Sequence, residues 1–217
     1  MNLARTTGLV LRTRPLTDTS LIVQWLTRDF GRVATVAKGA RRPKSLFRGQ
    51  LDLFFLADLS FARSRRSELH TLREVRLLQA HAGLRTELIY VQQASYCATL
   101  IEQTAEPDAP MPAVFENLRD LLEQLPRHTA QPQTIFGFEM KWLQELGLKP
   151  NLAEAALTQG TRQILERLIG MHWPDIFRLR LSDAQTKEIR LYLHGFIIYH
   201  LERIPRGRSA ALGRDEE

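Results

Sequence analysis

The first 79 residues alternate between short apolar runs and polar turns at close, regular spacing. The runs are rich in β-branched and aromatic residues, as strands are, and they cover 8–13, 20–26, 32–38, 51–62 and 69–78. Glycine in the connection "TRDFGR" indicates a hairpin between the second and third runs. Five strands within 79 residues predict a small, partly closed β-barrel of the OB type. Half of a β-sandwich is the competing interpretation.

From residue 80 the apolar residues recur every three or four positions, which is the period of an amphipathic helix. A first helix covers 84–101, and the proline-rich segment 104–112 ends it. Further helices follow at 114–125 and 135–146, and Ser182 with Gln185 forms a capping-box pattern before the last one. The sequence therefore predicts an α+β protein of several domains. We expect an OB-type barrel over 1–79, an all-α helical bundle over 80–204 and a flexible C-terminal tail over 205–217.

Charge is distributed unevenly between these regions. Residues 1–79 contain 15 Lys and Arg against 6 Asp and Glu, a net charge of +9, whereas residues 80–204 contain 12 against 15, a net charge of −3. Such asymmetry suggests that the barrel faces a polyanion, although a solvated basic surface would produce the same count.

Targeting and redox signals are sparse. The first apolar run is only four residues long before Arg12, shorter than the core of a signal peptide. No segment has the length of a membrane-spanning helix. Cys97 is the one cysteine, so neither an intrachain disulfide nor a zinc site built from cysteines can form. We expect a cytoplasmic, nucleoid-associated protein with no membrane contact.

The segment "VAKGARRPKSLFRG", residues 36–49, is the most basic connection between predicted strands. It partly matches a nucleotide-binding P-loop, but Pro43 precedes Lys44 and offers no backbone N–H to a phosphate. A strand rather than a helix is predicted after it. Cations along such a connection can instead follow the phosphates of a nucleic acid. These predicted DNA-binding residues are Lys38, Arg41, Arg42, Lys44 and Arg48.

Other basic residues flank the predicted strands. Arg12 and Arg14 border the first, and Arg63, Arg65 and Arg66 form a turn before the fifth; we expect all of them to frame one groove with the 38–48 connection. Base stacking needs an exposed aromatic side chain, for which Phe47 is the candidate. Trp25 is expected in the core.

The sequence contains no recognisable catalytic constellation. His194 and His200 are six residues apart and do not share a helix face, and neither H-E-x-x-H nor G-x-S-x-G occurs. We therefore predict no enzymatic activity, no metal site and no cofactor.

The stretch "GLVLRTRPLTDTSLIVQWLTRDFGRVATVAKGARRPKS" resembles the opening of the RecO family of bacterial recombination mediators and DNA repair proteins. Similarity continues in "QLDLF", "LHTLREVRLL" and "FEMKWLQELGLKPNL" and extends to "YHLER". The resemblance implies an N-terminal OB fold and a helical C-terminal domain. The family's basic loop falls on Lys38, Arg41, Arg42 and Lys44.

The resemblance also implies a function. Members bind single- and double-stranded DNA, anneal complementary strands, and cooperate with RecR and the single-stranded-DNA-binding protein SSB in loading RecA. Cations on or beside predicted helices are candidates for contacting the acidic C-terminal tail of SSB, namely Lys141, Arg203 and Arg206. Many members have a four-cysteine zinc module after an "L-G-x-x-P-x-L" stretch, but here "LGLKPNLAEAALTQGT" has no cysteine. No zinc is therefore expected.

Two other function classes fit the same residues. Small barrels also bind RNA, so an RNA-binding OB-fold factor is one alternative. The other is a protein-interaction adaptor whose basic barrel binds acidic partners.

Overall fold

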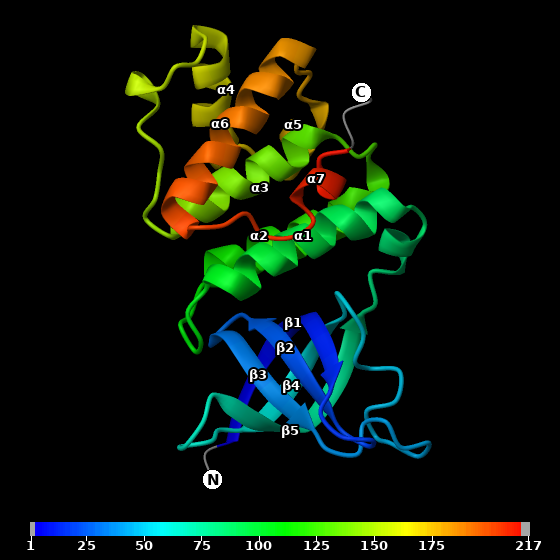
Figure 1. Ribbon diagram of the computed structural model, residues 1–217. Coiled ribbons are helices and arrows are strands. Elements are labelled where there is room, and N and C mark those ends of the chain that lie inside the picture. Colours follow the sequence, from blue (N-terminus) through cyan, green and yellow to red (C-terminus); the bar gives the residue numbers. More distant parts are fainter. Residues whose placement is uncertain (1–2, 214–217) are drawn as a thin grey trace. The chain divides into compact units, whose positions relative to one another are not determined.

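The computed structural model describes residues 3–213 and has five strands followed by a helical region (Figure 1). The strands are β1 (Leu3–Pro15), β2 (Leu21–Thr27), β3 (Gly31–Ala37), β4 (Leu56–Ala62) and β5 (Leu69–Gln79). The α-helices are α1 (Leu88–Thr104), α2 (Pro112–Gln124), α3 (Pro132–Glu145), α4 (Gln159–Gly170), α5 (Trp173–Arg178), α6 (Asp183–Leu201) and α7 (Arg208–Ala211). This element order confirms the predicted α+β class.

The strands close into a barrel in the order β1-β2-β3-β5-β4. The 13-residue strand β1 makes closure possible, because Leu3–Leu9 pairs with β4 and Gly8–Pro15 pairs with β2. The one parallel pairing joins β3 to β5 and completes the ring. This connectivity confirms the OB-type barrel and excludes the half-sandwich.

The interior of the barrel is filled by large apolar side chains from all five strands. Trp25 and Phe61 are fully buried there, and the indole N–H of Trp25 donates a 2.9 Å hydrogen bond to Thr35 Oγ1. This bond satisfies the one polar group of the buried indole. Because Trp25 is fully buried, it belongs to the core, as predicted, and cannot act as a stacking surface.

The predicted strand over 51–62 is too long. Strand β4 begins only at Leu56, because Phe54 has a left-handed backbone with φ of 65°. Its N–H donates to Val10 O at 2.8 Å and its carbonyl oxygen contacts His81 Nδ1 at 2.7 Å. Residues 51–55 therefore form a turn in which the Phe54 side chain is buried.

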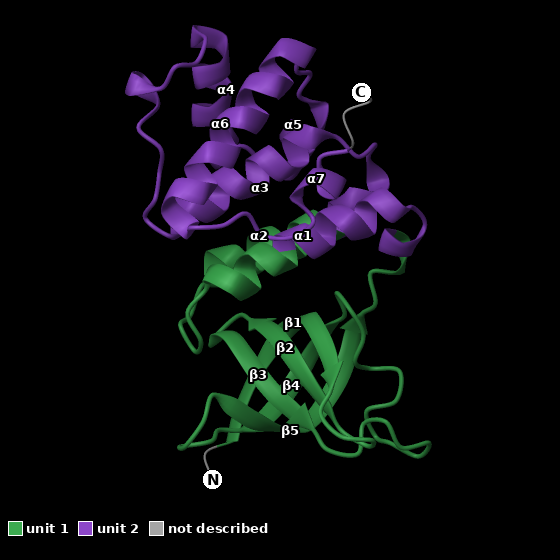
Figure 2. Ribbon diagram, in the orientation of Figure 1, with its two compact units in different colours: residues 1–83, 98–122 green, residues 84–97, 123–217 purple. Residues whose placement is uncertain are grey.

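The chain divides into two compact units whose boundaries differ from the predicted division at residue 80 (Figure 2). One unit comprises the barrel with residues 98–122, and the other comprises residues 84–97 and 123–217. Helix α1 contributes its first part to the helical unit and its last part to the barrel unit. The end of β5 at Gln79 is thus the end of the barrel but not of its compact unit.

In the helical unit, α3 is the central element. Every residue from 133 to 140 is buried, and α3 packs against α4, α5 and α6. Ser182 and Gln185 form the predicted capping box at the start of α6.

The predicted flexible tail is wrong for residues 205–213. These residues include α7, and Arg208 within it is only 4% exposed. Its guanidinium forms an ion pair with Glu139. The rest of the predicted tail, 214–217, lies outside the described residues.

Candidate nucleic-acid interface

The most basic segment of the barrel unit is residues 38–50, here called the basic strap. It leaves β3 and folds into consecutive turns, in which Arg42 N–H donates to Gly39 O at 3.0 Å and Ser45 N–H donates to Arg42 O at 3.1 Å. Gly39 and Gly49 have φ of 70° and 71°, which glycine adopts without strain. The strap is therefore a folded segment with defined backbone hydrogen bonds.

All five predicted cations of the strap are exposed to solvent: Lys38, Arg41, Arg42, Lys44 and Arg48. Within residues 3–213, none of them forms an ion pair with a carboxylate. Their positive charge is uncompensated locally, as a surface that binds phosphates requires.

Arg41 differs from the other strap cations because it holds the strap to the β1–β2 connection. Its guanidinium donates to Thr17 O at 3.1 Å and its backbone N–H donates to Thr19 O at 3.0 Å. We therefore assign Arg41 mainly to positioning the strap.

Arg12 and Arg14 lie in the half of β1 that leads to the β1–β2 connection. Arg14 is exposed, and the described residues contain no ion-pair partner for it. Arg12 instead forms an ion pair with Glu102 of α1, with Nε and Oε2 2.8 Å apart. Its charge is neutralised in this structure, which the sequence prediction missed.

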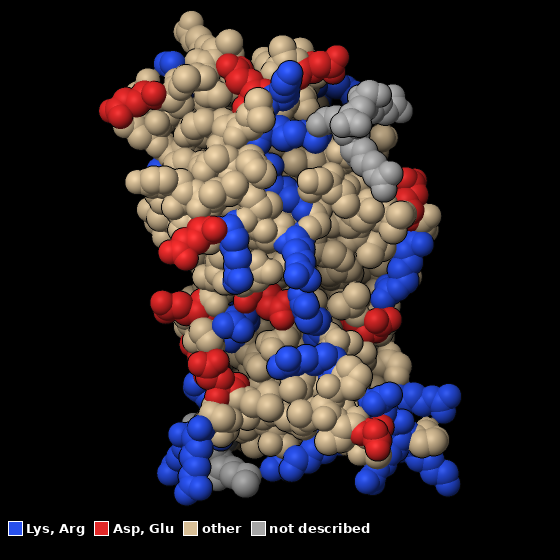
Figure 3. Space-filling view, in the orientation of Figure 1, with Lys and Arg blue, Asp and Glu red and all other residues tan. Residues whose placement is uncertain are grey.

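The second basic turn, Arg63, Arg65 and Arg66, does not join the strap in one groove. It follows Ala62, which pairs with Leu3 at the start of β1. The strap follows Ala37, and the pairing of β1, β2 and β3 places that residue at the end of β1. In Figure 3, Lys and Arg lie at both the lower left and the lower right, among other basic residues on the same face. The basic surface therefore has two separate parts.

Arg63 interacts with other residues of the barrel unit. Its guanidinium lies 3.5 Å from Asp108 Oδ2 and 5.6 Å from the centre of the Phe30 ring. Arg65 and Arg66 are exposed and, in the described part of the chain, without an ion pair. Only these two contribute uncompensated charge at that turn.

Phe47 is not the exposed aromatic that was expected. It is partly buried and packs against the apolar core of the barrel. The preceding residue, Leu46, is 88% exposed. The strap thus presents an aliphatic side chain to solvent and uses its aromatic one as an anchor.

The structure separates the three residues predicted to contact protein partners. Lys141 is half-buried: its Nζ donates to Ile169 O at 2.7 Å and lies 5.8 Å from the centre of the Trp173 ring. Burial lowers the pKa of this ammonium group. Arg203 and Arg206 are exposed after α6. Lys141 therefore serves the packing of its own unit.

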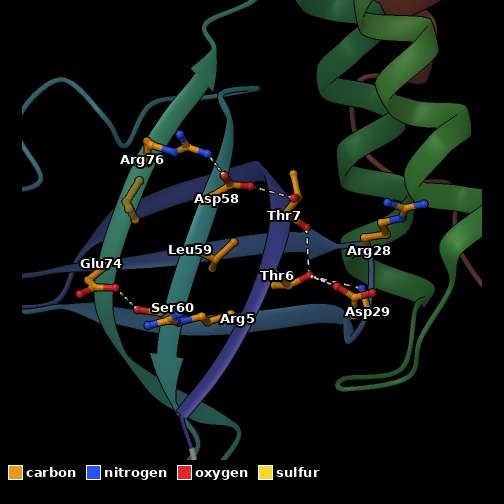
Figure 4. Close-up of a pocket in the computed structure, with 11 residues that line it drawn as sticks. Arg5, Thr6, Thr7, Arg28, Asp29, Asp58, Leu59, Ser60, Glu74 and Arg76 are labelled. Carbon is orange, nitrogen blue, oxygen red and sulfur yellow. Dashed lines mark hydrogen bonds and ion pairs between the residues drawn. The ribbon is translucent and has the colours of Figure 1, made fainter.

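A pocket of about 580 Å³ on the barrel wall was missed by sequence reasoning (Figure 4). Its charged lining residues are Arg5, Arg28 and Arg76 with Asp29, Asp58 and Glu74. Alternation in "LARTTG" could have indicated it, because period-2 spacing places Arg5 and Thr7 on one face of β1.

The pocket contains the ion pair between Arg76 and Asp58, whereas Arg28 pairs with Glu116 outside the lining. Arg76 lies 2.5 Å from Asp58, and this hydrogen bond lowers the pKa of the Asp58 carboxyl. Thr6 donates to Asp29 at 2.7 Å and Ser60 donates to Glu74 at 3.0 Å. The lining contains three cations and three anions, so the pocket has no excess of positive charge, and the strap is the stronger candidate for phosphate contacts.

Among residues 3–213, no three His, Cys, Asp or Glu side chains gather closely enough to hold a metal ion. In the same range, no helix is both long and apolar enough to cross a bilayer.

Comparison with known proteins agrees with the two-part organisation of the chain. A family model described as "Recombination protein O N terminal" matches residues 1–81, and one described as "Recombination protein O C terminal" matches residues 85–159. The described barrel lies within the first match.

Individual relatives extend this similarity. "DNA repair protein RecO" of Bacillus subtilis (strain 168) is 33% identical over 150 residues, which are 69% of this chain and 58% of that protein. The protein of the same name from Burkholderia pseudomallei (strain 1710b) is 30% identical over 199 residues, 86% of this chain and 71% of the relative. The protein of that name from Bacillus pumilus (strain SAFR-032) is 29% identical over 210 residues, which are 93% of this chain and 81% of the relative.

The match to the Bacillus subtilis protein thus spans less than two thirds of that relative's own length. Even so, the two family models together match residues from both the barrel and the helical region. The chain belongs to the RecO family of DNA repair proteins.

Proposed function

We propose that this chain binds single- and double-stranded DNA through the basic strap, without catalysing a reaction, and thereby promotes annealing of complementary strands. The observation that supports this most is the set of five exposed strap cations that have no carboxylate partner among the described residues. Cations that screen the phosphates of two strands lower the repulsion between them, which favours annealing.

Membership of the family extends the proposal to partners. We propose that the chain, associated with DNA in the cytoplasm, cooperates with RecR and assists RecA loading on DNA coated by SSB. Arg203 and Arg206 are exposed cations that an acidic SSB tail could contact. Lys141 is less suited to this role because its ammonium group is half-buried and hydrogen-bonded within its own unit.

The salt dependence of DNA binding tests the proposal. If the four strap cations other than Arg41 neutralise phosphates, log affinity should fall by about 2.8 to 3.6 for each tenfold rise in salt, and by about 3.5 to 4.5 if Arg41 also takes part. Measuring fluorescence anisotropy of a labelled oligonucleotide gives this slope. The triple variant Lys38/Arg42/Lys44→Ala leaves Arg41 in place and should reduce the slope by about 2 to 3.

A matched control removes the same charge elsewhere. Lys149, Arg180 and Lys187 are exposed in the helical unit, and their replacement by Ala should leave the slope nearly unchanged. Equal losses in both triple variants would contradict a role for the strap. If the chain binds RNA of the same sequence more tightly than DNA, an RNA-binding factor is favoured. If an acidic protein displaces DNA and binds with the same affinity as DNA, an adaptor is favoured.

Annealing of strands already coated with SSB tests the wider role. Acceleration by the chain would support it, whereas annealing only of bare strands would restrict the function to DNA binding.

A further inference from the structure

Leu46 is the most exposed large apolar side chain described, with 88% of its surface accessible to solvent. Single exposed leucines are ordinary on protein surfaces. Leu46 differs from them in two respects, namely how its backbone is held and which side chains surround it.

The backbone around Leu46 is fixed by hydrogen bonds on both sides. Arg48 N–H donates to Ser45 O at 3.2 Å, which closes a turn with Leu46 and Phe47 at its centre. Phe47 N–H donates to Ser45 Oγ at 3.1 Å. Gln50 Nε2 donates to Leu46 O at 2.8 Å. Leu46 is thus held at a defined turn rather than on a freely moving loop.

The two central residues of this turn face different surroundings. Phe47 packs against the barrel core, so it anchors the turn. Leu46 extends into solvent. An anchored aromatic beside an exposed aliphatic residue makes Leu46 a rigid protrusion, since little further ordering is needed when it contacts a ligand.

Cations lie on both sides of this protrusion in the sequence. Lys44 precedes Leu46 by two residues and Arg48 follows by two, and both are exposed. Apolar side chains between phosphate-binding cations act as wedges in several DNA-binding proteins, where they enter between adjacent base pairs and partly unstack them. Leucine is one of the residue types used in this way.

We infer that Leu46 inserts between adjacent bases of bound DNA and holds them partly unstacked, while Lys44 and Arg48 contact the flanking phosphates. The inference rests on the proposed DNA binding and adds a mode of contact to it. Pyrimidine–purine steps such as TA should be preferred, because they unstack most easily. Bases held apart in this way would lose stacking within their own strand.

A fluorescent base tests the inference directly. 2-Aminopurine is quenched when stacked, so its fluorescence in a TA step of a duplex should rise when the wild-type protein saturates the DNA. Leu46→Ala should bind with an unchanged salt slope and at most about tenfold weaker affinity, but lose most of the fluorescence rise. Leu46→Phe should retain the rise, because phenylalanine is also an effective wedge.

Two controls separate this inference from the proposed function. Leu78→Ala removes another exposed leucine, 46% accessible at the end of β5, and should leave the fluorescence rise intact. Lys44→Ala should weaken binding but give the full rise at saturation. If the wild-type protein binds no DNA, the proposed function itself fails.

Other results would overturn the wedge alone. The inference fails if DNA binds without a fluorescence rise, or if Leu46→Ala gives the same rise as wild type. It also fails if Leu46→Ala abolishes binding to vesicles containing phosphatidylglycerol while the DNA signal is unchanged, since the basic strap would then serve a lipid surface.

Discussion

Arg208 and Glu139 form a buried ion pair joined by two hydrogen bonds, Nε to Oε1 at 2.6 Å and the terminal guanidinium nitrogen to Oε2 at 2.9 Å. Their side chains are 4% and 0% exposed. Tyr96 adds a hydrogen bond to the same carboxylate, and burial together with the charge of Glu139 raises the pKa of its hydroxyl well above the ordinary value. The pair joins α7 to α3 within the helical unit.

Removing one partner of this pair should destabilise the helical unit strongly. Arg208→Met leaves the Glu139 carboxylate buried without its cation, which costs about 3 to 5 kcal/mol of unfolding free energy. Urea unfolding followed by tryptophan fluorescence, to which Trp142 and Trp173 of the same unit contribute, measures this loss. The double variant Arg208→Met/Glu139→Gln should recover part of it, because no buried charge remains. An unchanged unfolding midpoint for Arg208→Met would contradict the prediction.

The ion pair between Arg12 and Glu102 predicts a gain of DNA affinity by mutation. Glu102→Gln removes the carboxylate 2.8 Å from Arg12 Nε and releases that guanidinium for a phosphate. The salt slope of DNA binding should steepen by up to about 0.7 to 0.9, the contribution of one additional phosphate contact.

Glu123→Gln is the matched control for this measurement. It removes a carboxylate from another arginine, Arg127, that is not part of the proposed interface. Both variants add the same net charge. If they change affinity and slope equally, the effect comes from overall charge and Arg12 does not contact DNA.

The barrel could be predicted from sequence because its strands are local patterns of apolar and polar residues. The pattern does not show the backbone conformation of single residues. Phe54 is apolar like its neighbours in the predicted strand, yet its positive φ means that β4 begins only at Leu56. Ion pairs were missed for a related reason. Glu102 is 90 positions from Arg12 and Glu139 is 69 from Arg208, so only the folded chain shows that these arginines are neutralised.

The sequence also could not show which apolar side chain of the strap is exposed to solvent. Leu46 and Phe47 are adjacent apolar residues, and aromatic character made Phe47 the natural choice for a nucleic-acid contact. The turn closed by Ser45 and Arg48 decides which of the two faces the barrel. The basic residues themselves could be identified, because Lys and Arg are rarely buried without a partner.

Lys141 predicts a distinct dependence of stability on pH. Burial lowers its pKa below the ordinary value of 10.5, so the folded protein releases this proton at lower pH than the unfolded chain does. Between the two pKa values the unfolded chain binds more protons, and stability therefore rises with pH.

Comparison with Lys141→Met isolates this contribution, because other groups titrate in both proteins. The difference in unfolding free energy, wild type minus variant, should increase as the pH rises toward the ordinary lysine pKa of 10.5 and level off above it. Urea unfolding at several pH values measures it. A difference that is flat or decreases would mean that the ammonium group is not disfavoured by burial.

Gly31 in the barrel unit should tolerate no side chain. It begins β3 with φ of 62°, and a Cβ there would lie 1.7 Å from the backbone oxygen of Ala109 in the α1–α2 connection. That connection cannot easily move away, because Asp108 N–H donates to Arg32 O at 2.9 Å and Arg32 Nε donates to Ala105 O at 3.0 Å. Gly31→Ala therefore combines backbone strain with a clash against a held backbone.

Gly49→Ala separates these two costs. Gly49 has a similar φ of 71°, but a Cβ there would meet nothing within 4 Å. The control should lose about 1 to 2 kcal/mol from the left-handed backbone alone. Gly31→Ala should lose about 1 to 3 kcal/mol more, the range typical of forced overpacking. Urea unfolding of the two variants measures the difference, and equal losses would show that the α1–α2 connection yields to the added methyl group, so that it is not held against β3.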